Sequence, residues 1–461
     1  MKKFIGFLTL IVLSFFSLAA SQILVPATAV GEAEFDALIQ QKYPADGAGA
    51  LVLVLKGDEV LLKKAYGRAV IEFQVPMNIE SPFNLGSITK QFTAVSILML
   101  QQAGKLHIDH EVKQYVPEYK QAHSAKITLR NLLTHTAGIP GYDGKNGYTH
   151  HGTEADSFET ILAAFNDLPL DFSPGTNVNY SNSGYVLLGR IIEKVSGLSY
   201  QEFVRRRIFA PLGMQDSSFF DYYRVLPGLA KGYEISDSSP YKTIHGKASK
   251  PSLYGDGGIT STLNDMTKWY RAIRNNSLID EQSKQLAFST FKLTDGRDSK
   301  HALGWKVSTL GKFKTIEHGG SNHGFENYVL QLPEQDLTIM IFSNLNRSYP
   351  GELAERLANT LVNQPIASNR EIELEPAVLE QFTGNYRYPD GTKRTIEREG
   401  TYLYSVRGGG ARERLVPFAS NQFYFESAPV YWLRFEKEPA TGKNVMYSES
   451  RVSPYIRAEQ L

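Results

Sequence analysis

The chain has 461 residues, of which 42% are hydrophobic and 21% charged, which is the composition of an ordinary globular protein. Its formal net charge of +1 gives no general attraction for nucleic acid or for an acidic partner. Cysteine is absent, which excludes disulfides, thiolate metal sites, a cysteine nucleophile and a bacterial lipoprotein anchor.

The N-terminus has the pattern of an export signal. The basic pair Lys2-Lys3 precedes an apolar run over residues 4–20, and small residues then offer cleavage sites after Ala19, Ser21 or Ala29. We therefore predict a signal peptide over residues 1–29 and a periplasmic or secreted protein with no membrane span after its removal. The alternative is a protein anchored by an uncleaved N-terminal segment, because the run is close to spanning length.

Residues 30–365 are predicted to form one large α/β unit, an antiparallel sheet flanked by helices with an additional helical region. An amphipathic helix is expected over 32–42, followed by a hairpin of strands 49–55 and 59–65 around Lys56-Gly57-Asp58. Later helices are expected at 87–103, 112–115, 129–133, 185–195, 263–274 and 352–362, and later strands at 312–317, 326–332 and 337–342.

The sequence pattern changes after residue 365. Residues 363–376 are polar and contain Pro365 and Pro376, which indicates a linker, placed at 366–376. Over 377–461, short aromatic-rich strands alternate with turns and no helix is expected; the strands are predicted at 386–388, 395–398, 402–406, 423–426 and 431–435. Strands at this spacing favour a small antiparallel β-barrel as a second domain.

Ser87-Ile88-Thr89-Lys90 opens the most apolar helix of the chain. A serine and a lysine three residues apart lie one turn apart on the same helix face, so their side-chain ends can meet. Serine needs a base beside it to act as a nucleophile, and burial favours the neutral lysine that can serve as that base. Free backbone N–H groups near the helix start are also suited to stabilise an oxyanion.

The same spacing occurs at Ser239 and Lys242 and at Ser289 and Lys292, so the motif alone is weak. Only Ser87 opens a predicted buried helix, which singles it out as the candidate nucleophile.

Two further motifs carry suitable chemistry. In Tyr180-Ser181-Asn182, a tyrosine could pass a proton to a leaving group and an amide could orient a substrate carbonyl. In His318-Gly319-Gly320-Ser321, the glycines after a predicted strand allow close approach of a substrate backbone. Each motif alone is more often a turn or a strand end, but the three in this order indicate a catalytic site.

In this order of motifs the sequence resembles the β-lactamase-related serine hydrolases, a superfamily of class C β-lactamases, DD-peptidases, D-aminopeptidases and esterases. The family pattern of Ser-x-x-Lys, Tyr-x-Asn and Lys-Thr-Gly or His-x-Gly reads here Ser87–Lys90, Tyr180–Asn182 and His318–Gly320. The LLTHTAGIPG stretch from Leu132 is also similar to this family. The tail after Pro376 is similar to lipocalin-like barrels appended to some of these hydrolases.

The resemblance implies a role for each residue. Ser87 would be acylated while Lys90 and Tyr180 transfer protons, and the backbone N–H groups of Ser87 and Ser321 would form an oxyanion hole. Asn182 would hold the acyl-side amide, and His318 and Gly320 would contact the substrate. Neither a metal nor a cofactor is needed, and the partner is a small-molecule or peptide substrate; the oligomeric state is left open.

His318 departs from the lysine that the family's lactamases and DD-peptidases usually have at this position, a lysine that helps to hold a substrate carboxylate. A free histidine has a pKa of about 6.5, so it would be uncharged at neutral pH and protonated in mild acid. Peptidase, amidase or esterase activity is therefore favoured over antibiotic resistance. The alternative is a catalytically quiet, penicillin-binding-protein-like protein that binds a peptide or glycan.

Overall fold

A computed structural model describes residues 32–120, 126–143, 145–146, 148, 156–221, 224–236, 239–243, 254–322, 324–362, 371–388, 391–426, 428–439, 441–450 and 453–461. The predicted signal peptide, at 1–29, and residues 366–370 of the predicted linker lie outside these ranges. Within them, no helix has both the length and the apolar character needed to cross a membrane.

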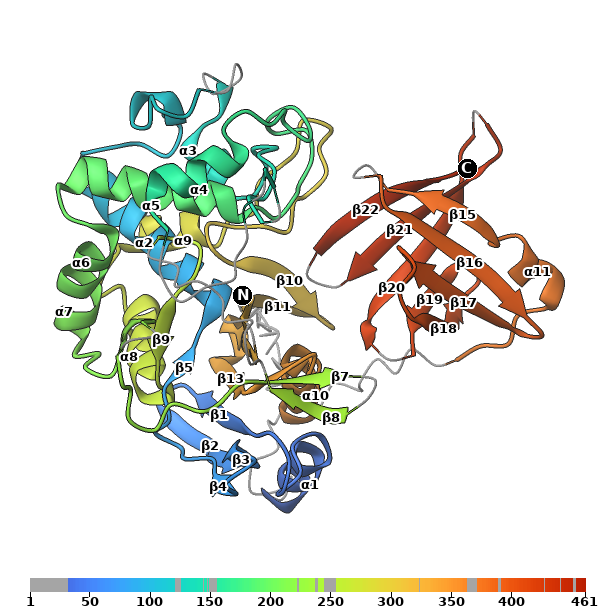
Figure 1. Cartoon of the computed structure of the whole chain (residues 1–461), viewed down its shortest axis with the longest axis horizontal. Coiled ribbons are helices and arrows are strands. Elements are labelled where there is room, and N and C mark those ends of the chain that lie inside the picture. Colours follow the sequence, from blue (N-terminus) through green and yellow to red (C-terminus); the bar gives the residue numbers. More distant parts are fainter. Residues whose placement is uncertain are drawn as a thin grey trace, which may run out of the picture.

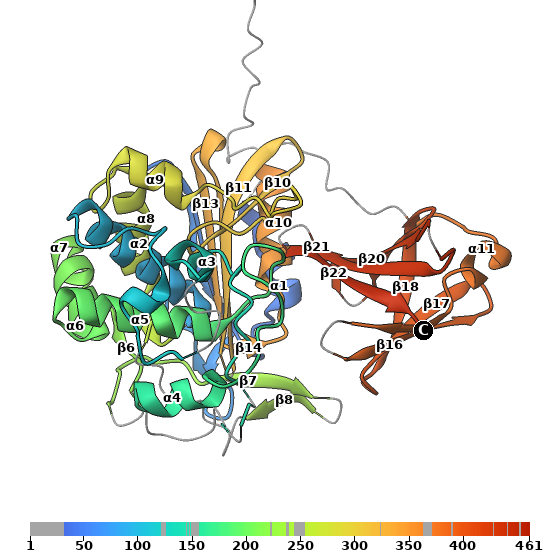
Figure 2. The same ribbon diagram turned by 90° about the horizontal axis from the view of Figure 1, so that it is seen from above.

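The larger domain is built around a six-stranded antiparallel sheet with the strand order β10-β11-β12-β13-β1-β2. The strands are β1 (Ala50–Lys56), β2 (Glu59–Tyr66), β10 (Lys306–Leu310), β11 (Phe313–Asn322), β12 (Phe325–Leu332) and β13 (Leu337–Ser343). Both faces of this sheet are covered by helices, as seen edge-on in Figure 2.

Strand β1 shows how its sequence supports this layering. Alternate side chains of a strand point to opposite faces, and here Leu51, Leu53 and Leu55 enter one hydrophobic core while Ala50, Val52 and Val54 enter the other. An uninterrupted apolar run is what a strand covered on both faces requires.

The first core packs the sheet against the helical region, and the second packs it against α1 (Glu32–Lys42) and α10 (Pro350–Leu361). The helical region comprises η1 (Gly86–Ile88), α2 (Thr89–Gln102), η2 (Val112–Gln114), α3 (Leu129–Leu133), α4 (Phe158–Phe165), α5 (Asn182–Ser196), α6 (Tyr200–Val204), η4 (Arg205–Phe209), α7 (Ala210–Leu212), α8 (Leu263–Arg274) and α9 (Glu281–Ala287). A one-turn helix, η5 (Pro333–Gln335), joins β12 to β13.

Short strands extend the domain at its edges. One small sheet has the order β5-β9-β6, a second β14-β7-β8, and β3 pairs with β4. Their bounds are β3 (Arg68–Val70), β4 (Val75–Pro76), β5 (Phe83–Asn84), β6 (Ser218–Phe219), β7 (Tyr233–Ser236), β8 (Ser239–Thr243), β9 (Ile259–Ser261) and β14 (Leu345–Asn346). The pairing of β5 with β9 fixes the chain immediately before Ser87.

The C-terminal domain is a closed antiparallel barrel that lies to one side of the larger domain (Figure 1). Its strands are β15 (Gly384–Arg387), β16 (Lys393–Glu399), β17 (Tyr402–Arg407), β18 (Arg412–Ala419), β19 (Gln422–Phe425), β20 (Ala428–Lys437), β21 (Asn444–Ser450) and β22 (Ser453–Gln460). The expectation that this domain lacks a helix is wrong, because α11 (Pro376–Glu380) packs Leu379 into the barrel core. The predicted fold class, a helix-flanked antiparallel sheet with a C-terminal β-barrel, is confirmed.

Candidate active site

Ser87 lies in the single turn η1, and Lys90 lies in the first turn of α2, which continues it directly. Helix α2 is buried along nearly its whole length, because apolar side chains such as Phe92, Val95 and Ile97 occur around its circumference. Lys90 is therefore 0% exposed although it carries an amine. The helical spacing brings its Nζ to 3.2 Å from Ser87 Oγ, as the sequence predicts.

Two further oxygen atoms surround the amine. Lys90 Nζ donates to the backbone carbonyl of Asp256 at 2.6 Å and to Asn182 Oδ1 at 2.8 Å. The orientation of the Asn182 amide is set by its Nδ2, which donates to Asp143 Oδ2 at 3.2 Å. Asn182 thus contacts the amine directly.

Strand β11 lies against the turn that carries Ser87, and two glycines permit the contact. A Cβ atom on Gly320 would lie 1.9 Å from the Leu85 carbonyl oxygen, and one on Gly86, whose φ is +54°, would lie 2.9 Å from the backbone nitrogen of Ser321. Gly320 therefore allows the backbone of Leu85 to pack against β11, and it also lines the pocket. The backbone of Ser321 is held beside the residue that precedes Ser87.

Tyr180 reaches the same place from the loop before α5. The Lys90 Nζ lies 4.8 Å from the centroid of its ring, and the side chain is 36% exposed, so it faces both the amine and solvent. The ring of His318 lies 6.3 Å from it.

His135, which the sequence analysis did not assign to the site, holds this tyrosine loop. Its ring stacks on Tyr180 with a centroid distance of 4.3 Å, and its Nδ1 accepts the backbone N–H of Ser181 at 3.1 Å. Its carbonyl oxygen accepts the N–H of Asn179 at 3.0 Å. His135 has a φ of +57° and belongs to the family-like LLTHTAGIPG stretch, a signal that could have directed attention to it.

His318 on β11 is 4% exposed, and burial together with the nearby Lys306 and Lys90 lowers its pKa to about 3. The sequence-based expectation that it is protonated in mild acid is therefore wrong, because a buried imidazole beside two lysines disfavours the charged form. Its Nδ1 lies 2.5 Å from the carbonyl oxygen of Gly319.

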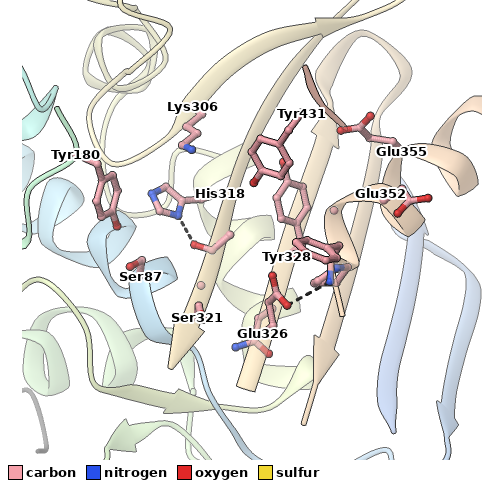
Figure 3. Close-up of a pocket in the computed structure, with 16 residues that line it drawn as sticks. Ser87, Tyr180, Lys306, His318, Ser321, Glu326, Tyr328, Glu352, Glu355 and Tyr431 are labelled. Atoms are coloured by element: carbon pink, nitrogen blue, oxygen red, sulfur yellow. Dashed lines mark hydrogen bonds between the residues drawn. The ribbon is translucent and has the colours of Figure 1, made fainter. Parts of the chain in front are cut away.

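A cavity of about 320 Å³ opens beside Ser87, at the lower end of the range for small-ligand pockets (Figure 3). Of the predicted site residues, Ser87, Tyr180, His318, Gly320 and Ser321 line it, whereas Lys90 and Asn182 lie behind Ser87. Its wall also includes side chains that the sequence analysis missed: Lys306, Glu326, Tyr328, Tyr349, Glu352, Glu355 and, from the barrel, Tyr431.

The two other Ser-x-x-Lys matches form no comparable arrangement. Ser289 donates to the Gln285 carbonyl, while Lys292 pairs with Asp298 on an exposed surface. Ser239 lies on strand β8 rather than at the start of a helix. In the part of the chain that the structure describes, no cluster of three or more potential metal ligands is found.

Comparison with known proteins agrees with this fold. A family model described as Beta-lactamase matches residues 35–364, and the chain therefore belongs to the beta-lactamase family. It is 26% identical to Penicillin-binding protein 4* of Bacillus subtilis (strain 168) over 430 residues, which cover 88% of this chain and 94% of that protein.

Two solved structures are similar to the chain. The octameric penicillin-binding protein homologue from Pyrococcus abyssi superposes with a TM-score of 0.65 at 23% identity, covering 93% of this chain and 99% of that one, a likeness of fold. A D-stereospecific amidohydrolase from Streptomyces sp. has a TM-score of 0.60 at 25% identity, covering 69% of this chain and 97% of that one.

Proposed function

We propose that this protein is a serine hydrolase that cleaves amide or ester bonds through an acyl-enzyme on Ser87. The observation that carries the proposal is the set of contacts around Lys90 Nζ. Two of its neighbours, the Asp256 carbonyl and Asn182 Oδ1, can only accept hydrogen bonds. A neutral amine would donate its two N–H groups to these oxygens and direct its lone pair at the hydroxyl of Ser87, 3.2 Å away.

In the proposed reaction, Ser87 Oγ attacks the substrate carbonyl carbon and its proton passes to Lys90. The carbonyl oxygen becomes an oxyanion, which the backbone N–H groups of Ser87 and Ser321 stabilise. The bond to the leaving group then breaks, and Tyr180, which faces both Lys90 and the cavity, relays the proton to the departing amine or alcohol. Water attacks the resulting ester, releases the acid and returns the proton to Ser87.

The substrate preference is inferred from His318. The uncharged imidazole itself offers no positive charge to a substrate carboxylate, unlike the lysine of the family's lactamases; the basic residue of this cavity wall is Lys306, on the neighbouring strand β10. We therefore expect esters, amides, or peptides bound by their N-terminal part, rather than penicillins or peptides that end in D-Ala-D-Ala. The similarity to a D-stereospecific amidohydrolase supports an amide among the substrates.

Turnover of a substrate panel tests the proposal. The panel contains D- and L-amino-acid amides, D-amino-acid peptides, simple esters and a chromogenic cephalosporin. Ser87→Ala should lower turnover by several orders of magnitude, because a covalent nucleophile is lost. Ser289→Ala, in the second Ser-x-x-Lys motif, is the matched control and should retain full turnover. Undiminished turnover by Ser87→Ala would refute the assignment.

A further inference from the structure

One end of the C-terminal barrel carries two arginines that face each other. Arg394 on β16 and Arg407 at the end of β17 are directly opposed in the strand ladder, so their side chains lie on the same face. That face points to the interior, because Ile396 and Leu403, two and four residues away along the two strands, lie on the same face and are buried in the barrel core. We call Arg394 and Arg407 the arginine pair.

The guanidinium of Arg394 is almost enclosed, with 8% of the residue exposed. Its Nε donates to the hydroxyl of Tyr388 at 2.9 Å and its Nη1 to Ser405 Oγ at 2.5 Å. The guanidinium carbon lies 5.0 Å from the centroid of the Phe425 ring. Its Nη2 donates to none of the residues that the structure describes.

Arg407 adds a second positive charge at the same place. Its guanidinium carbon lies 4.7 Å from the ring centroid of Tyr388, the tyrosine whose hydroxyl Arg394 contacts. The Tyr388 hydroxyl also lies 2.5 Å from Ser448 Oγ. Over the described part of the chain, no carboxylate forms an ion pair with either member of the arginine pair.

This arrangement differs from that of most arginines of the barrel and is unfavourable without a ligand. Buried arginines are normally paired, and like charges directly opposite each other in a sheet are destabilising. Other barrel arginines do have carboxylate partners: Arg398 with Glu380, Arg412 with Glu399, Arg414 with Glu426, Arg434 with Glu449, and Arg457 with Glu438.

We propose that this end of the barrel is a binding site for an anionic group, a carboxylate or a phosphate, held between Arg394 and Arg407. A guanidinium presents N–H donors in a planar fork that matches the oxygens of such a group. The buried rings of Phe425 and Tyr388 pack against the guanidinium groups of Arg394 and Arg407 and hold them in place. The proposal does not depend on the reaction at Ser87.

Binding to the full-length protein tests the site, with benzoate, phenyl phosphate and the neutral benzamide as probes in calorimetric titrations. Benzoate or phenyl phosphate should bind and benzamide should not; a response to benzoate alone identifies a carboxylate site, and one to phenyl phosphate alone a phosphate site. Arg407→Gln should weaken binding about 10-fold or more, because it removes a charge-assisted contact. The matched control is Arg398→Gln, on the strand that carries Arg394 but already paired with Glu380, which should bind like the wild type.

Stability and activity measurements separate a ligand site from a structural contact. Without an anion, Arg407→Gln should unfold no earlier than the wild type, since it removes one of two opposed like charges, and its turnover of substrate should be unchanged. Equal binding of benzamide and benzoate would overturn the proposal, as would unchanged anion binding by Arg407→Gln. Arg407 is exposed, so this variant is informative even if Arg394→Gln fails to fold.

Discussion

Acid should destabilise the larger domain before its carboxylates protonate, because three histidines are buried together at the active site. His135 and His301 have a ring-centroid distance of 5.1 Å, and His318 lies close enough to lower the pKa of both. Burial is the main cause of the lowered pKa in all three, and Lys306 and Lys90 add to it at His135 and His318.

The size of the effect follows from His318, whose pKa falls from 6.5 to about 3 on folding. The unfolded chain binds a proton below about pH 6.5 while the folded protein does not until about pH 3. His318 therefore leaves the free energy of unfolding unchanged above about pH 6.5, and it lowers this free energy progressively as the pH falls toward about 3. Each pKa unit corresponds to about 1.4 kcal/mol, so at about pH 5 the loss from His318 alone is about 2 kcal/mol. His135 and His301 act in the same direction.

Urea unfolding at about pH 7.5, 6 and 5 measures this loss. Trp269 and Trp305 are buried in the larger domain, so their fluorescence in a Trp432→Phe background reports that domain alone. Between about pH 7.5 and 5, the free energy of unfolding should fall by more than about 2 kcal/mol.

Variants assign the loss to the buried histidines. His318→Gln should reduce the loss by about 2 kcal/mol, whereas the exposed His107→Gln should leave it unchanged. A free energy of unfolding that is constant over this range would refute the reasoning.

Three other predictions concern the substrate, the barrel and export. His318→Lys should raise the efficiency toward a carboxylate substrate relative to its methyl ester by about 10- to 150-fold. The increase should be equal at about pH 5.5 and 8, because the native imidazole is neutral at both. An unchanged acid-to-ester ratio would remove His318 from the substrate site. A chain ending near Ser368, outside the described residues, should stay soluble and keep Ser87 reactive toward a fluorophosphonate. Its KM should rise for substrates that reach the cavity wall formed by Tyr431. Loss of labelling would show that the barrel completes the catalytic site. The mature protein should begin between Ala20 and Val30 and be exported, which N-terminal sequencing of native protein checks; an intact Met1 in the membrane fraction would contradict it.

Local patterns were sufficient to predict much of the larger domain. Helix α8 has the bounds expected from its periodicity, and the hairpin of β1 and β2 turns at the expected Lys56-Gly57-Asp58. The contact between Ser87 and Lys90 was predictable because it depends only on one turn of helix. The contribution of Lys306 and Tyr431 to the same cavity was not, since it depends on long-range packing.

The barrel was harder to predict strand by strand. Strands β18, β21 and β22 were missed because charged and polar residues interrupt their apolar pattern, as in the Arg412–Ala419 strand that begins Arg-Glu-Arg. In a small barrel only one face of each strand is buried, so the apolar signal is short. The five residues of α11 were too few to distinguish from a linker. The neutral state of His318 could not be predicted from the sequence either, since it depends on burial and on lysines from α2 and β10.

The most direct measurement of the proposed chemistry is the intact mass of the full-length protein after reaction with a fluorophosphonate, followed by peptide mapping. A single adduct on Ser87 is predicted, absent from Ser87→Ala and strongly reduced in a variant without the base, Lys90→Met. Ser289→Ala should be labelled like the wild type. An unlabelled wild-type protein that also turns over no member of the substrate panel, or an adduct on Ser239 or Ser289 instead, would contradict the assignment of Ser87 as the nucleophile.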